Sequence, residues 1–263
     1  MLHFKISACK IWMMGLMSWW IVAGWGQTLH AQESIQDSTI RLIGLDLSYH
    51  GLIPGGDMGG QYGFNSQIGA ELIFKGRHNW YATVGWYFLF SDSVTQPGVI
   101  DPLLVPGNFA IGDNGLLSAV GIMQRGVVIP LAIGKIIPIV KSHNPNSGLF
   151  VELGGQFIQH KIHLRAIDER VTLLTGEYRK GYDQMANGFG IREMVGYRYF
   201  SKGGNVNFAA GFVFSQNFTR NRRSVNFITG QQDNSMRLDL LSGFRVAWTY
   251  AFYRRAPESS YFR

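Results

Sequence analysis

Alternation of apolar and polar residues with a period of two, repeated in segments of about ten residues or more, most constrains what this chain can fold into. The segment near the C-terminus places Leu238, Leu240, Phe244, Val246, Trp248, Tyr250 and Phe252 on one face, and Arg237, Asp239, Gly243, Arg245, Ala247 and Thr249 on the other. Successive side chains of a strand point to opposite faces. The pattern therefore predicts a strand that separates an apolar environment from a polar one.

Eight such segments follow one another along the chain. They lie near 39–50, 63–75, 79–91, 116–139, 148–165, 189–200, 205–218 and 236–253. The fourth is more uniformly apolar than the others and contains Pro130 and Pro138, so its alternation is the weakest. We predict an all-β fold, a transmembrane antiparallel up-and-down β-barrel of about eight strands with both ends of the chain on the same side.

The connections between the segments alternate in length, which supports this prediction. Short links cover 75–79, 141–147 and 201–204, and long links cover 51–63, 91–115, 165–188 and 219–235. Outer-membrane barrels have short periplasmic turns and longer outer loops. The apolar residues of the link 91–115 predict that it folds over the barrel mouth or is held by a partner.

Alternation alone does not say which face is inside, so a soluble, lipocalin-like barrel with an apolar interior is an alternative. The polar face carries six glycines: Gly44, Gly69, Gly85, Gly154, Gly196 and Gly243. Small residues suit the narrow interior of an eight-stranded barrel. We therefore place the aromatic face outside, with an interfacial girdle of Trp80, Tyr197, Tyr199, Tyr250 and Phe252 near the short turns.

The N-terminus has the three parts of a secretory signal peptide. Lys5 and Lys10 precede an apolar run over 11–25, and small residues lead to Ala31. The alternative, an uncleaved anchor helix, is disfavoured because the run is shorter than the roughly 20 residues that span a bilayer. We predict a signal peptide over 1–31, a barrel over 32–263 and a location in the bacterial outer membrane.

Charge and cysteine content exclude several functions. Removing 1–31 leaves 24 − 2 = 22 basic residues against 17 acidic ones, without a dense basic tract, so nucleic acid is not an expected partner. The only cysteine, Cys9, lies in the predicted signal peptide, so the mature chain has no disulfide or thiolate metal site. His160 and His163 fall on opposite faces of one strand and do not converge on a metal. We expect no metal, cofactor or catalytic residue.

The polar face offers both signs of charge in equal number. Its members are Asp46, Glu71, Glu152 and Asp239 beside Arg192, Arg198, Arg237 and Arg245. We predict that they form a paired network that fills the interior, since buried charges need partners. A proton or ion path is the alternative.

Two further groups are candidate contact sites. The outer loops carry Arg179, Lys180, Arg220, Arg222 and Arg223, which either bind lipopolysaccharide phosphates or are solvated. Glu193 is a carboxylate that the alternation places mid-strand on the lipid face, where it is costly without a protein partner or a bulge. A lipid A-modifying enzyme is a further reading of Glu193, but no serine lies beside a histidine at that depth.

From Arg125 onward the order of elements resembles the outer-membrane β-barrel families of Bacteroidota, which are OmpX- and OmpA-like eight-stranded barrels. The resemblance lies in "RGVVIPLAIGK" (125–135), "GLFVELGGQFIQHKI" (148–162), "YRKGYDQMANGFG" (178–190) and "FTRNRRSVNF" (218–227). It implies a barrel without assigned activity, sometimes accompanying secretion or gliding machinery. We predict a non-enzymatic barrel whose outer loops bind a ligand, lipopolysaccharide or an envelope partner; the alternative is an accessory subunit of such a machine.

Overall fold

The computed structural model describes residues 39–96, 98–106, 109–139, 144–201, 207–227 and 229–252. The predicted signal peptide over 1–31 and the first two residues of the predicted strand 205–218 lie outside these ranges. The signal peptide and its cleavage therefore stay predictions.

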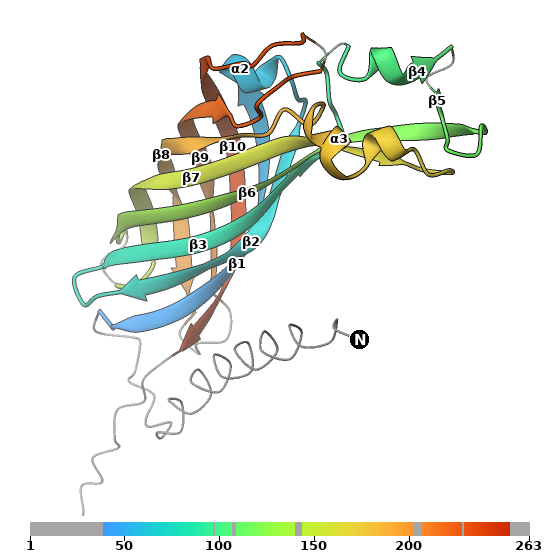
Figure 1. Cartoon of the computed structure of the whole chain (residues 1–263). Helices are drawn as coiled ribbons and strands as arrows, with labels where there is room; N and C mark the ends of the chain where they lie inside the picture. Colours follow the sequence, from blue (N-terminus) through green and yellow to red (C-terminus); the bar gives the residue numbers. More distant parts are fainter. Residues whose placement is uncertain are drawn as a thin grey trace, which may run out of the picture. The chain divides into compact units, whose positions relative to one another are not determined.

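Eight antiparallel strands close into a barrel (Figure 1). They are β1 (Leu42–Gly55), β2 (Asn65–Lys75), β3 (Trp80–Ser91), β6 (Leu117–Ile137), β7 (Gly148–Ala166), β8 (Ala186–Phe200), β9 (Asn207–Asn221) and β10 (Met236–Phe252). Each strand pairs with the next one along this series, and the pairing of β1 with β10 closes the ring. The predicted up-and-down architecture is confirmed.

Strand ends depart from the prediction where a partner strand extends the ladder. β1 continues five residues beyond residue 50, because Gly55 still pairs with Leu240 of β10. Within the least regular segment, the β3–β6 ladder is interrupted between the pairs Val84–Leu131 and Tyr87–Val128. Pro130 lies in this gap, and a proline has no N–H to donate to a ladder.

The exterior of the barrel is apolar and the interior holds the charges. Along β7, Leu149, Val151 and Leu153 are exposed, whereas Phe150 and Glu152 between them are buried. The short-turn ends carry exposed aromatic side chains at Trp80, Tyr197, Tyr250 and Phe252, and Tyr199 is half-buried. This arrangement suits a barrel surrounded by lipid. No helix in the described ranges is both long enough and apolar enough to cross a membrane.

The long connections build an organised layer at one end of the barrel, here called the outer end. They contain α2 (Gly56–Gly59), η1 (Asp101–Leu103), η2 (Thr172–Leu174), α3 (Gly176–Lys180) and the short strands β4 (Leu104–Val105) and β5 (Phe109–Ile111). The β6–β7 hairpin continues past the last β3–β6 pair, Ser91–Gln124, and β5 pairs onto this extension (Figure 1). The segment predicted as a loop over 91–115 is thus partly sheet, and the strand after it begins at Leu117.

Candidate functional site

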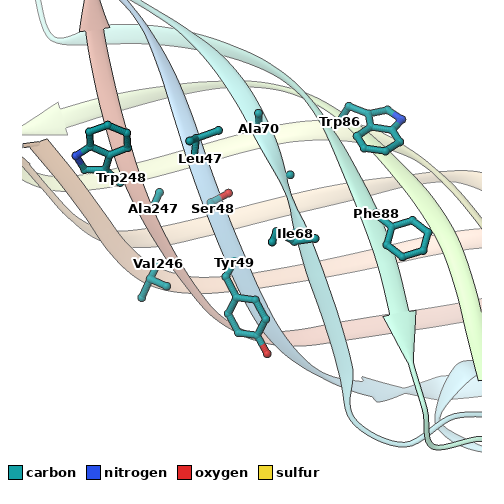
Figure 2. Close-up of a pocket in the computed structure, with 11 residues that line it drawn as sticks. Leu47, Ser48, Tyr49, Ile68, Ala70, Trp86, Phe88, Val246, Ala247 and Trp248 are labelled. Atoms are coloured by element: carbon teal, nitrogen blue, oxygen red, sulfur yellow. The ribbon is translucent and has the colours of Figure 1, made fainter.

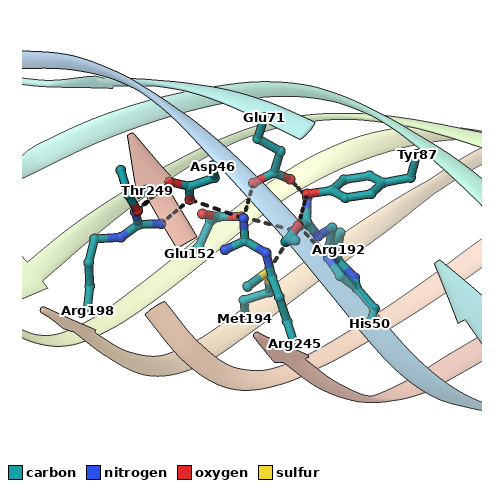
Figure 3. A network of polar contacts seen from close by, with 11 residues as sticks. Asp46, His50, Glu71, Tyr87, Glu152, Arg192, Met194, Arg198, Arg245 and Thr249 are labelled. Carbon is teal, nitrogen blue, oxygen red and sulfur yellow. Dashed lines mark hydrogen bonds and ion pairs between the residues drawn. The ribbon is translucent and has the colours of Figure 1, made fainter. Parts of the chain in front are cut away.

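Three carboxylates and three arginines form a buried cluster inside the barrel (Figure 3). Arg198 donates to both oxygens of Asp46, at 3.1 and 2.8 Å, and Thr249 donates to the same carboxylate at 2.6 Å. Arg245 bridges Asp46 and Glu71, with Nη2 at 3.1 and 2.9 Å from their oxygens. The cluster is electrically balanced, as buried charges require.

Arg192 links the remaining members of this interior cluster. Its Nη1 donates to Glu71 Oε1 at 2.6 Å, and its Nη2 lies 3.7 Å from Glu152 Oε1. Glu152 is almost fully buried, and neither carboxylate oxygen has a hydrogen-bond partner among the described residues. Glu152 is therefore the least satisfied member of the cluster.

Aromatic rings pack against the arginines and close the space around them. The guanidinium carbon of Arg198 lies 5.5 Å from the Tyr81 ring centroid and 5.8 Å from that of Phe150. A glycine makes room for one of these rings, because a Cβ at Gly134 would lie 2.4 Å from Tyr81 Cζ. Charge and ring volume together fill the cross-section at this level, consistent with the narrow interior of an eight-stranded barrel.

A second polar group lies toward the outer end. His160 Nε2 is 3.0 Å from Asp239 Oδ2, and Thr219 donates to the same oxygen at 2.6 Å. The ring of Tyr62, from the loop after β1, meets the His160 ring edge-on at 5.6 Å. The loop and the barrel interior are thus in direct contact.

Arg237, like Asp239, lies outside the interior cluster of three carboxylates and three arginines. It is half-buried near the outer end of β10, where its guanidinium pairs with Asp233, four residues earlier in the preceding loop. Alternation assigns a side chain to the inner or outer face of the barrel but does not give its position along the barrel axis. Arg237 lies on the polar face beyond the level of the other charges.

Lys75 and Asn146 close the short-turn end of the barrel. The Lys75 ammonium donates to Asn146 Oδ1 at 2.8 Å and to the Ile40 carbonyl at 3.1 Å, and the lysine side chain is buried. We did not predict this contact, Thr249, Thr219 or the aromatic rings as parts of the site. For the residues on strands, the alternation already placed the side chains on the inward face, and this was the available signal. Nothing in the sequence pairs Lys75 with a turn that lies 71 residues away.

The basic residues predicted at the outer loops have different surroundings. Lys180 pairs with Glu177 within α3 at 2.6 Å, Arg223 binds Asp183 at 2.6 Å, and Arg222 donates to Asn187 at 2.6 Å. Arg220 is exposed at the outer end of β9, and Arg179 lies in α3. Three of the five residues therefore have partners within the chain, and their role as a lipopolysaccharide or partner contact stays a prediction.

Glu193 lies at the centre of β8 and is exposed on the apolar face. Its cross-strand partners are Leu153 and Phe214. Gln216, which is also exposed, follows two residues after Phe214 on β9. In the described ranges, no serine or histidine stands opposite Glu193 on a neighbouring strand, as a nucleophilic centre would need.

A shallow groove of about 870 Å³ runs over the outside of β10, β1, β2 and β3 (Figure 2). Its walls carry Tyr49, Trp86, Phe88 and Trp248, and Ala70 lies in its floor. Side chains of this kind contact lipid and not a polar substrate. In the described part of the chain, no group of three His, Cys, Asp or Glu side chains could hold a metal ion.

No family model matches the chain. No curated protein sequence matches it either.

Several solved outer-membrane barrels are similar in structure. The attachment invasion locus protein Ail of Yersinia pestis has a TM-score of 0.38 at 6% identity, over 80% of this chain and 98% of that one. The Neisserial surface protein NspA has a TM-score of 0.36 at 13% identity, over 78% of this chain and 96% of that one. The outer membrane protein OprG of Pseudomonas aeruginosa has a TM-score of 0.38 at 10% identity, over 84% and 100%.

The class of the protein follows from its own strand pairing and burial. It is a closed eight-stranded up-and-down barrel with an apolar exterior and a charged interior. Scores and identities this low say nothing of a more particular identity, so the resemblance to barrels of Bacteroidota stays a prediction.

Proposed function

We propose that the protein is a non-enzymatic integral barrel of the bacterial outer membrane that presents a structured outer layer for binding. The membrane location is supported by the exposed apolar side chains on the eight strands and by the charges inside. A role in binding is supported by the organisation of the long connections, which carry helices and added strands at the outer end.

The observation that carries the binding role is an apolar surface on the outer hairpin extension. Its exposed side chains are Phe109 and Ile111 of β5, Leu116 just before β6, and Leu117 at the start of β6. They lie beyond the barrel ring, where lipid tails do not cover them. Exposed apolar side chains gathered at one place are typical of an interaction site.

The interior is proposed to be a seal and not an ion path. The arginine–carboxylate cluster and the rings of Tyr81 and Phe150 that pack against it fill one part of the interior, and the Lys75–Asn146 contact closes the short-turn end. A catalytic role for the His160–Asp239 pair is disfavoured by its geometry. Thr219 donates to the carboxylate, whereas a nucleophilic hydroxyl hydrogen-bonds to the histidine.

Fractionation and channel recording test this proposal. We expect a heat-modifiable band confined to the outer-membrane fraction, and no conductance when the purified barrel is inserted into planar bilayers. Protease added to intact cells should cleave the segment 92–116. A soluble periplasmic band would overturn the membrane assignment, and steady ion conductance would overturn the seal.

A second candidate, an accessory subunit of an envelope machine, is favoured by Glu193 and Gln216. A carboxylate and an amide exposed mid-strand on the lipid face are costly there and call for a partner that carries hydrogen-bond donors. A photo-crosslinking residue at position 193 should capture a membrane protein if this holds. The same residue at Leu72, exposed on the outward face of β2 across the barrel, is the matched control.

A further inference from the structure

Cationic side chains gather outside β7, at the point where the barrel ring ends. Lys161, His163 and Arg165 alternate with the buried Ile162 and Leu164, so the three share the outward face. Arg125 of β6 is the cross-strand partner of Lys161. We call these four residues, together with Arg179 of α3, the basic cluster.

Two observations show that the members of the basic cluster are close together. A pocket of about 380 Å³ is lined by His163, Arg165, Arg170 and Arg179, and also by the carboxylates Asp168 and Glu169. Burial lowers the pKa of His163, and the positive charges of Arg179, Lys161, Arg125 and Arg165 lower it further. His163 lies beyond the last β3–β6 pair and so outside the barrel ring.

The carboxylates near the basic cluster are largely engaged elsewhere. Asp168 accepts the Ala119 amide at 3.1 Å, and Glu169 accepts from Asn114 at 2.8 Å. Arg125 has an exposed partner, Asp92, at 3.4 Å. Among the described residues no carboxylate lies within 4.0 Å of the cationic groups of Lys161, Arg165 or Arg179. Within the described ranges, the cationic groups of Lys161, Arg165 and Arg179 are therefore free of direct ion pairs and can contact an added anion.

The basic cluster continues the lipid-facing surface of β6 and β7 outward. The pair Phe157–Ile129 is followed by Gln159–Val127 and then by Lys161–Arg125, all on the same face. A lipid whose acyl chains lie against the apolar pairs places its head group beside the cationic ones. At this boundary the anionic groups are phosphates, with which arginine side chains form charge-assisted hydrogen bonds.

We propose that the basic cluster binds the phosphate group of an outer-leaflet lipid whose acyl chains lie on the apolar face of β6 and β7. The inference rests on the proposed membrane location and names the ligand class of one outer site. It does not involve Lys180, Arg222 or Arg223, which have partners of their own. The pocket formed with η2 and α3 gives the phosphate a bounded site and not only a charged surface.

Native mass spectrometry of the purified full-length barrel in detergent tests the site. The probes are diphosphorylated lipid A, the same lipid without its phosphates, inorganic phosphate and a sulfated oligosaccharide. Each cationic side chain near a membrane surface accounts for about a fivefold change in binding. We therefore expect Lys161→Gln with Arg165→Gln to weaken binding of diphosphorylated lipid A by about 30-fold, and dephosphorylation of the lipid to act in the same direction.

The control is Arg77→Gln, which removes one exposed charge from the turn after β2, at the opposite end of the barrel. Lipid binding that is unchanged in the double variant, or reduced equally in the control, would refute the site. Inorganic phosphate or the sulfated oligosaccharide binding as tightly as the lipid would refute the lipid as its ligand.

Failure of this inference is distinguishable from failure of the proposed function. Lys161 and Arg165 lie on the outward face at and beyond the last β3–β6 pairs, so the double variant should keep its heat-modifiable band in the outer-membrane fraction. A variant that inserts normally while lipid binding is unchanged overturns only the phosphate site. A wild-type chain absent from the outer membrane overturns both.

Discussion

Arg245→Leu tests whether the charges inside the barrel act as one paired network. Arg245 is buried and its Nη2 contacts Asp46 and Glu71 at 3.1 and 2.9 Å. Its removal leaves three interior carboxylates facing two arginines. Breaking a buried ion pair by removing one partner costs about 3–5 kcal/mol, because the other charge stays buried. We expect the free energy of unfolding to fall by about that amount.

A second variant separates charge imbalance from lost packing. Combining Arg245→Leu with Glu71→Gln restores balance at two carboxylates and two arginines, while the amide can still accept from Arg192. Contacting residues in one network show coupling of about 0.5–3 kcal/mol. The double variant should therefore be more stable than the sum of the two single losses predicts.

Urea titration of the barrel refolded in lipid vesicles, followed by tryptophan fluorescence, gives these free energies. Arg77→Gln is the control, since Arg77 is exposed in the turn after β2 and should change stability by less than about 0.5 kcal/mol. The paired network would be refuted if Arg245→Leu lost less than about 1 kcal/mol. Strict additivity of the two substitutions would refute the coupling.

Three other outcomes are expected. Gly134→Val should displace the Tyr81 ring and lower the urea midpoint, because even a Cβ would lie 2.4 Å from Tyr81 Cζ. Gly155→Ala should leave the midpoint unchanged, because its Cβ would have only the Gly190 carbonyl within 4 Å. Glu193→Leu should raise stability in pure lipid by about 1 kcal/mol or more if no partner is present, measured by the same titration; no gain would contradict a lipid-exposed carboxylate. Hydrogen bonds from the Thr172 hydroxyl and amide lower the pKa of Asp113. Their contribution to the stability of this loop is therefore complete above about pH 4, and it is lost as the pH falls through the lowered pKa. Amide exchange at Thr172 should accelerate in that acidic window, and Asp113→Asn should abolish the pH dependence.

The barrel could be predicted from the sequence because its two environments differ so strongly. A strand that faces lipid and a charged interior must alternate, and connections at the two ends of a membrane barrel differ in length. The same reasoning does not give strand ends, since β1 reaches Gly55 only through its pairing with β10. It also does not show how the outer hairpin extends past the ring, because that depends on the pairing of β5 with β6.

Depth along the barrel axis explains which interior residues could not be assigned from alternation. Arg237 and Arg245 have the same parity on β10, yet one pairs with a loop residue and the other with two carboxylates from β1 and β2. Depth depends on the register between strands, which joins Asp46 to both Glu71 and Thr249. The basic cluster was overlooked for the same reason. Lys161, His163 and Arg165 share the parity of the lipid-facing residues, and only the end of the β3–β6 ladder shows that they lie at and beyond the rim of the apolar surface.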